Sequence, residues 1–140
     1  MPALRMHTSH HADATVITVA GEIDLASAPA LHRFIAETHQ TPAAHLVLDL
    51  AEVPFMDSMG LRVLLEAYTA AEQHGGAVHL AAVQRAPARL LQLTRLHERF
   101  RLHASTQLAL AAIATASATT PSGAVDGGAL RGPRGATDPS

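Results

Sequence analysis

Residues 45–68 read HLVLDLAEVPFMDSMGLRVLLEAY, and the two halves of this stretch carry different patterns. The first six residues form a short, nearly continuous apolar run, which is typical of a strand buried on both faces of a parallel sheet. After Met59 the large apolar residues recur at the spacing of one helical face. These residues are Leu61, Leu64, Leu65 and Tyr68. A buried strand followed closely by an amphipathic helix predicts the α/β fold class.

The rest of the chain continues this alternation of strands and helices. Apolar and β-branched residues predict strands over 14–20, 77–83 and 100–103, and a short strand over 4–8 can pair with the first of them. Further helices are expected after Ser27, which can act as an N-cap, after Pro87, and from residue 105 or 106 to about 116. In the helix after Pro87, the residues expected to face inward are Leu90, Leu93 and Leu96.

The predicted architecture is one α/β domain over residues 1–116. Its central sheet is mostly parallel (mixed), with about four to five strands and about four packed helices. Residues 117–140 are rich in Pro, Gly, Ser and Ala, and this composition predicts a disordered tail. Right-handed crossovers would place Ser58 at the carboxyl end of a strand, where α/β proteins carry their sites.

Composition excludes several classes of chemistry. The 140 residues contain no cysteine, and all ten basic residues are arginine, which rules out thiol catalysis, disulfides and a lysine nucleophile. Aromatic residues make up only 3% of the chain and Trp is absent, which disfavours direct nucleic-acid binding. The ten histidines show no metal-ligand spacing, so no metal is expected. No signal-like or membrane-spanning apolar run is visible, and a cytoplasmic monomer is expected.

The formal net charge of −2 hides an uneven distribution. Between residues 21 and 75, eight acidic residues stand against two arginines, whereas five arginines stand against one glutamate between 76 and 110. The acidic half, which includes Glu22, Asp24 and Asp57, could steer a basic patch of a partner protein.

Ser58 lies between the predicted strand and helix and has three interpretations. Either Asp57 or Ser58 could cap the helix, a role worth about 1 kcal/mol. A nucleophilic serine would need the G-x-S-x-G elbow, but Met56 occupies the first glycine position and no histidine is nominated as the base. A phosphoacceptor at a helix start would change the local charge by about −1.5 to −2, which suits a switch.

Four blocks in a characteristic order resemble a STAS domain, and in particular the small bacterial anti-sigma-factor antagonists. The blocks are GEID at 21–24, LVLDL at 46–50, FMDSMGL at 55–61 and the glycine pair at 75–76. The resemblance spans roughly residues 4 to 115. It implies a central sheet with packed helices and a protein-binding activity, without enzymatic activity or a cofactor of its own.

The resemblance also implies partners and site residues. An unphosphorylated antagonist binds an anti-sigma factor, a serine kinase of the histidine-kinase-like ATPase fold, and so frees a sigma factor. Phosphorylation switches this binding off, and a PP2C-type phosphatase restores it. Carried to this chain, the phosphoacceptor is Ser58. The residues implied at the partner surface are Asp24, Met56, Asp57, Met59 and Gly60, with Asp57 shaping the acceptor loop and Gly60 permitting its close turn.

Two residues depart from the family pattern. Met59 follows the acceptor where Ser or Ala is usual, and methionine adapts to irregular partner surfaces. Arg95 stands where the family usually has a helix-ending glycine, which predicts a locally different helix end. An alternative function is also open, because STAS domains serve as accessory or regulatory subunits of transporters, of the lipid-transport ATPase or anion-transporter type, without a phosphorylation switch.

Overall fold

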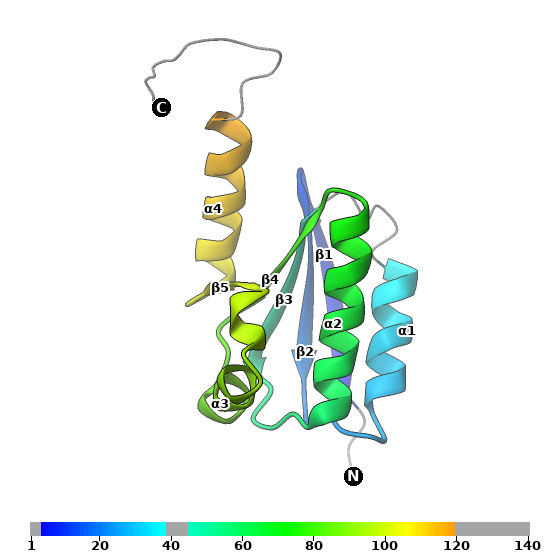
Figure 1. Cartoon of the computed structure of the whole chain (residues 1–140). Helices are drawn as coiled ribbons and strands as arrows, with labels where there is room; N and C mark the ends of the chain where they lie inside the picture. The colour runs from blue at the N-terminus through cyan, green and yellow to red at the C-terminus, as the bar shows by residue number, and fades with distance from the viewer. Residues whose placement is uncertain (1–3, 39–44, 120–140) are drawn as a thin grey trace. The chain divides into compact units, whose positions relative to one another are not determined.

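A five-stranded mixed sheet forms the centre of the protein (Figure 1). The computed structural model describes residues 4–38 and 45–119, with side chains to residue 116. The strands lie in chain order: β1 (Arg5–His11), β2 (Ala14–Ala20), β3 (His45–Glu52), β4 (Ala77–Ala81) and β5 (Arg101–His103). β1 pairs antiparallel with β2, and each later pair is parallel. The predicted α/β class and mostly parallel sheet are confirmed.

The helices follow the predicted order. They are α1 (Ala28–Thr38), α2 (Ser58–Gln73), α3 (Arg85–Leu93), the 3-10 turn η1 (Leu96–Glu98) and α4 (Thr106–Thr119). α1 and α2 lie side by side on one face of the sheet (Figure 1). Between them and the strands lies a hydrophobic core, which includes Ile17, Leu31, Leu48, Leu64 and Leu80. Burial of apolar surface at about 25 cal/mol per Å² makes this layer the main stabilising contact of the fold.

The hairpin of β1 and β2 is longer than the sequence indicates. Strand β1 extends to His11, which pairs with Ala14 across a turn of Ala12 and Asp13. The prediction ended this strand at residue 8 because the polar residues that follow carry little strand signal. Pairing with the buried β2 supplies the backbone hydrogen bonds that keep them extended.

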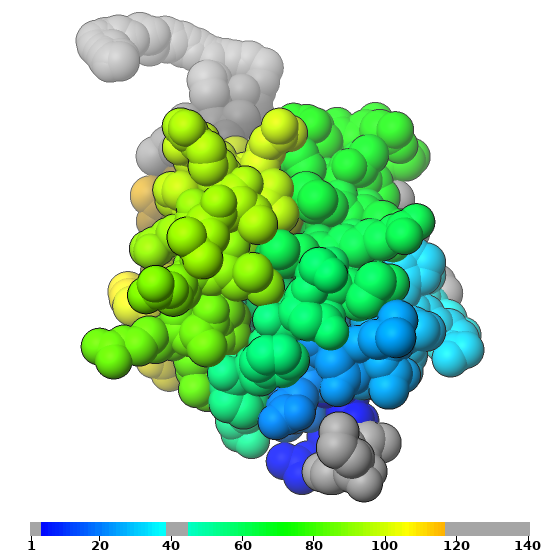
Figure 2. Space-filling model, turned by 60° about the horizontal axis from the view of Figure 1, so that its bottom comes forward, coloured from blue at the N-terminus to red at the C-terminus, as the bar shows by residue number. Residues whose placement is uncertain are grey.

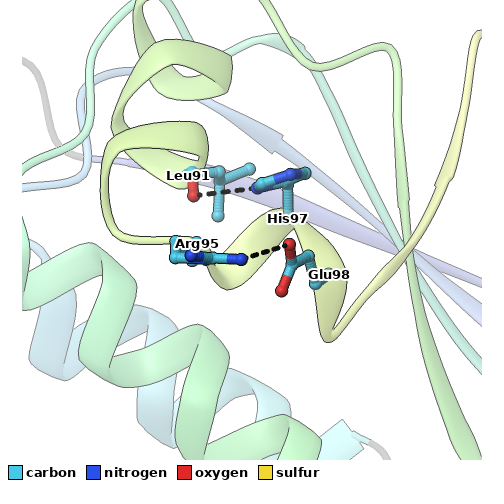
Figure 3. A network of polar contacts seen from close by, with 4 residues as sticks. All are labelled: Leu91, Arg95, His97 and Glu98. Atoms are coloured by element: carbon cyan, nitrogen blue, oxygen red, sulfur yellow. Dashed lines mark hydrogen bonds and ion pairs between the residues drawn. The ribbon is translucent and has the colours of Figure 1, made fainter.

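The α3 region corrects the prediction that Leu90, Leu93 and Leu96 face inward together. Helix α3 buries Pro87 and Leu91, while Leu93 is 71% exposed. The helix ends at Leu93, and Arg95 adopts a left-handed conformation with φ of 64°. The chain therefore changes direction before Leu96, which lies in η1. Figure 3 shows this connection, in which the Arg95 Nη2 atom lies 3.4 Å from Glu98 Oε2.

The end of the chain differs in one respect from the predicted boundary at residue 116. Helix α4 continues to Thr119, so residues 117–119 are helical, because the alanine-rich sequence sustains helical propensity to this point. The remainder of the predicted tail, residues 120–140, lies outside the described residues. The chain divides into two units between Leu110 and Ala111, and each is described by itself. The first unit contains all five strands, and the sites considered below belong to it.

Candidate functional site

Two loops are joined at the carboxyl ends of β2 and β3. Ile23 and Met56 form a parallel bridge in which the Ile23 amide donates to Phe55 O at 3.1 Å and the Asp57 amide donates to Ile23 O at 3.1 Å. The loop carrying Asp24 therefore lies directly beside the loop carrying Asp57. Figure 2 brings this end of the first unit forward, with the blue loop after β2 next to the blue-green loop before α2.

Asp57 is the N-cap of α2. Its Oδ1 atom accepts hydrogen bonds from the Met59 amide at 2.9 Å and the Gly60 amide at 3.4 Å. A carboxylate that bonds the second and third amides of a helix satisfies two otherwise unpaired donors and complements the helix dipole. The capping role left open between Asp57 and Ser58 is therefore filled by Asp57.

Ser58 is the first residue of α2 and is exposed. Within residues 4–38 and 45–119, no hydrogen bond involves its hydroxyl. A nucleophilic serine is normally hydrogen-bonded to its general base, and this arrangement is not present in the described part of the chain. The hydroxyl is instead accessible at a helix start, held there by the cap that Asp57 makes.

Gly60 has a different role from the predicted one. It lies inside α2 and is buried, and its φ is outside the left-handed region, so it permits no special turn. A Cβ atom at this position would stand 2.4 Å from Met56 Cγ and 2.9 Å from Ile23 Cγ2. Glycine is therefore required for close packing of α2 against the bridge between the two loops. The prediction of a close turn was wrong because the helix begins two residues earlier.

Met56 also lies beneath the surface rather than on it. Its side chain is 3% exposed and belongs to the hydrophobic core, where it fills the space above Gly60. Met56 therefore contributes almost no surface to the loops, and its predicted contact with a partner stays a prediction. Met59 is half-buried and packs against the same core, so only part of its side chain is available for contact.

Asp24 supports its own loop. Its Oδ1 atom accepts hydrogen bonds from the amides of Ala26 and Ser27, each at 3.0 Å, and lies 3.2 Å from Ser27 Oγ. The Ser27 hydroxyl accepts from the Asp24 amide at 3.0 Å and donates to Glu22 O at 2.8 Å. Ser27 thus stands directly before α1, as predicted, but its hydroxyl orders the loop. The half-buried Asp24 carboxylate is turned to backbone amides.

Two large apolar side chains are exposed on the two loops that the bridge between Ile23 and Met56 joins. Leu25 is 69% exposed and follows Asp24, and Phe55 is 44% exposed and precedes Met56. Exposed Glu22 and Arg62 lie near them in the sequence. No motif in the sequence marks Leu25 or Phe55 as a site residue. Each loop also contains large apolar residues that are buried, Ile23 in the first and Val53 and Met56 in the second, so the sequence does not distinguish the exposed residues from the buried ones. We call Leu25, Phe55 and Ser58 together the loop surface.

Other site classes find no support in the described residues. No group of three or more His, Asp or Glu side chains among them is arranged to hold a metal ion. None of the helices in the part of the chain that the structure describes is both long enough and apolar enough to cross a membrane.

The arrangement of strands, helices and loops is that of a known family, and the STAS domain model matches residues 5–109. The chain belongs to the STAS domain family. Among curated relatives of this STAS domain is the anti-sigma-F factor antagonist RsfB of Mycobacterium tuberculosis. The two are 31% identical over 113 residues, which cover 79% of this chain and 90% of the relative.

Solved structures of an anti-sigma factor antagonist and of a transporter STAS domain have folds similar to that of this chain. An anti-sigma factor antagonist from Mycobacterium paratuberculosis is 32% identical, with a TM-score of 0.68 over 80% of this chain and 95% of that chain. The STAS domain of a SulP transporter from Vibrio cholerae has a TM-score of 0.64 at 22% identity, covering 80% of this chain and 89% of that one. At that identity the second similarity shows a shared fold.

Proposed function

We propose that this protein is an anti-sigma-factor antagonist whose binding is switched by phosphorylation of Ser58. The observation that carries the proposal is that Asp57, and not Ser58, caps the start of α2. Asp57 caps the helix, which leaves the exposed Ser58 hydroxyl without a structural hydrogen bond among the described residues. The relatives named as anti-sigma-factor antagonists, at 31% and 32% identity, support the same function.

The protein contributes a hydroxyl and a surface, while its partner contributes the catalysis. The anti-sigma factor would supply ATP, Mg²⁺ and a general base. The Ser58 oxygen would bond to the γ-phosphorus as the bond to ADP breaks, and the hydroxyl proton would pass to the base. A PP2C-type phosphatase would return the hydroxyl by hydrolysis. The protein is thus a substrate and ligand that acts in the cytoplasm with these partners.

The loop surface explains why the phosphate would matter. In the unphosphorylated protein, Leu25 and Phe55 expose apolar area on the two joined loops, and the second of these loops leads into Ser58. A phosphate carries about −1.5 to −2 charges at pH 7. The Met59 and Gly60 amides that could bind it already donate to Asp57. The added charge would therefore stand beside a carboxylate and an apolar contact, where its desolvation weakens binding. A hundredfold loss of affinity requires about 2.7 kcal/mol.

A phosphorylation assay tests the proposal. The protein is incubated with its cognate anti-sigma factor and ATP, and the modified residue is mapped by mass spectrometry. We expect a single phosphate on Ser58, none on Ser58→Ala, and an unchanged mark on Ser9→Ala, a control on strand β1. Ser58→Ala should keep partner binding, whereas Ser58→Asp should weaken it. Phosphate at another residue, or on none, would refute the assignment of Ser58.

A pull-down from the native organism separates this function from the transporter alternative. Recovery of an ATPase-fold anti-sigma factor supports antagonism. Recovery of a transporter subunit, with unmodified Ser58, supports the accessory role that the fold shared with the Vibrio cholerae SulP domain keeps open.

A further inference from the structure

Three histidines on neighbouring strands form a continuous line of hydrogen bonds. The His45 Nδ1 atom on β3 lies 2.9 Å from His79 Nε2 on β4, and His79 Nδ1 lies 2.9 Å from His103 Nε2 on β5. The register explains the line, because His79 pairs with Val47 and His103 pairs with Ala81, so each histidine lies one diagonal step from the next. We call His45, His79 and His103 the histidine ladder.

The middle residue of the ladder is buried. His79 is 2% exposed, while His45 and His103 are half-buried. A buried polar group needs hydrogen-bond partners, and the two outer imidazoles provide them for both ring nitrogens of His79. The ladder therefore satisfies His79 with side chains alone and links β3, β4 and the short edge strand β5.

Counting protons shows what the ladder can hold. A neutral imidazole has one N–H donor and one acceptor nitrogen, so three neutral rings form both bonds with all donors in one direction. One added proton on His45 or on His103 leaves both hydrogen bonds in place. The protonated end ring donates to His79, and His79 then donates to the ring at the other end. With both ends protonated, His79 would need two acceptor nitrogens, and a neutral ring has one. A second proton therefore breaks one of the two hydrogen bonds.

Some of the charged groups around the ladder oppose a positive charge on its histidines, and one of them favours it. Arg101 on β5 pairs with His79 in the register and opposes a positive charge on His79 and on His45, whereas Asp13 favours charge on His45. Asp49 on β3 shares this face, but its Oδ1 atom accepts from the Ala51 amide at 3.0 Å. The neighbouring residues of β2 on this face are Ala14, Val16 and Thr18, with Arg5, His7 and His11 of β1 beyond them. His97 of η1 lines the same pocket as His103, and residues 106–119, which follow β5, contain no ionisable side chain.

Burial keeps the middle of the ladder neutral near pH 7. Desolvation lowers the pKa of His79 to about 4, and positive charge on His45, His103 and Arg101 acts in the same direction. Desolvation also lowers the pKa of His45. The positive charge of Arg101 lowers this pKa further, while the negative charge of Asp13 raises it. Both hydrogen bonds of the ladder are thus present at neutral pH. The ladder binds its first and second added protons as the pH falls.

We propose that the histidine ladder is an acid-sensitive latch that holds β5 on the sheet and releases it when a second proton breaks a ladder bond. Strand β5 is the element that responds, because it has three residues, lies at the edge and is joined to one strand only. Loss of the bond between His79 and His103 leaves its backbone pairing with β4 unsupported by side chains of the ladder. The latch depends on the fold alone and stands whether or not Ser58 is phosphorylated.

Amide hydrogen exchange at residues 101–103 tests the latch in the full chain. After correction for the intrinsic pH dependence of exchange, we expect β5 to exchange about tenfold faster at about pH 5 than at about pH 7.5, the factor given by one lost hydrogen bond. His103→Ala should exchange as fast at the higher pH as the wild type does at the lower, with no further increase on acidification. His10→Asn, an exposed control on β1, should behave as the wild type.

Titration of the imidazole nitrogens by NMR gives a second measurement on the wild-type protein. The ladder should bind its protons in two separated steps that belong to the group, as coupled sites do. Three independent titrations at ordinary histidine values would overturn the proposal. Corrected exchange at β5 that is equal at both pH values would also overturn it, and this measurement remains decisive if His103→Ala fails to fold.

Discussion

The Asp57 carboxylate holds the Met59 amide at 2.9 Å, and this hydrogen bond fixes the first turn of α2 without using Ser58. The cap and the proposed phosphorylation site are therefore adjacent but separate residues. Each can be changed separately, which makes the two roles measurable in isolation.

Asp57→Ala should destabilise the protein by about 1 kcal/mol, because two amides of α2 lose their acceptor. Ser58→Ala should change the free energy of unfolding by less than about 0.5 kcal/mol, as expected for an exposed side chain. Urea unfolding of both variants and of Asp57→Asn, which keeps an acceptor oxygen, measures the difference. An equal loss in the two alanine variants would contradict the assignment of the cap.

Gly60→Ala should destabilise the protein by about 1–3 kcal/mol, the range for overpacking a close contact. The added Cβ would stand 2.4 Å from Met56 Cγ, and a shorter side chain at position 56 would relieve that clash. A double-mutant cycle with Met56→Ala measures this coupling, since neighbouring residues deviate from additivity. Additive losses would show that Gly60 is required for some reason other than Met56.

Arg95→Gly should stabilise the protein by about 1 kcal/mol, because φ of 64° strains a residue that has a Cβ. The ion pair with Glu98 that it removes is exposed, 78% and 56% for the two side chains, and contributes little. Thermal or urea unfolding checks the gain. Thr94→Gly is the matched control, since Thr94 is right-handed with φ of −94° and should lose stability.

Stability should fall as the pH is lowered from about 6.5 towards 4. The His79 pKa of about 4 lies below the ordinary value of 6.5, so the unfolded chain binds the proton first on acidification. The stability that depends on a neutral His79 is fully present above about pH 6.5. A decrease in the free energy of unfolding on the order of 2 kcal/mol is expected at about pH 5. Urea unfolding at about pH 7.5 and 5 measures it. His79→Leu should lose this part of the pH dependence, while His74→Gln should keep it.

Leu25→Ala and Phe55→Ala should each weaken binding to the anti-sigma factor by about tenfold, as truncation of a well-placed interface residue does. Both side chains are exposed, at 69% and 44%, so the fold should be retained. Isothermal calorimetry with the unphosphorylated protein measures the affinity. Leu93→Ala is the control, because Leu93 is 71% exposed and belongs to α3, outside the loop surface as defined by its three residues. Unchanged affinity in Leu25→Ala and Phe55→Ala would place the interface elsewhere, and an equal loss in Leu93→Ala would show that the effect is not specific to the loop surface.

The elements of the fold follow from local patterns, whereas the contacts that define the sites do not. The apolar runs of β2 and β3 and the helical spacing after Met59 predict their elements correctly, because one buried face determines each of them. The contact of Gly60 with Met56 depends on the bridge to Ile23, more than thirty residues away in the chain. The histidine ladder likewise depends on the register of three strands, and no spacing of His45, His79 and His103 in the sequence indicates it.

The same limit explains the error at α3. A spacing of three residues favours Leu90, Leu93 and Leu96 as one face, but that face exists only if the helix continues through Arg95. The left-handed conformation there ends it, and Leu91 takes the buried position.

The bridge between Ile23 and Met56 has a consequence for how such regulators diversify. Because backbone hydrogen bonds join the two loops, the proposed contact surface is ordered without a partner, so little ordering entropy would be lost on association. Side chains at positions 25 and 55 can then be exchanged on a constant backbone, leaving position 58 untouched. Under the proposed function, the residues that select the partner and the residue that is phosphorylated can therefore change independently of one another.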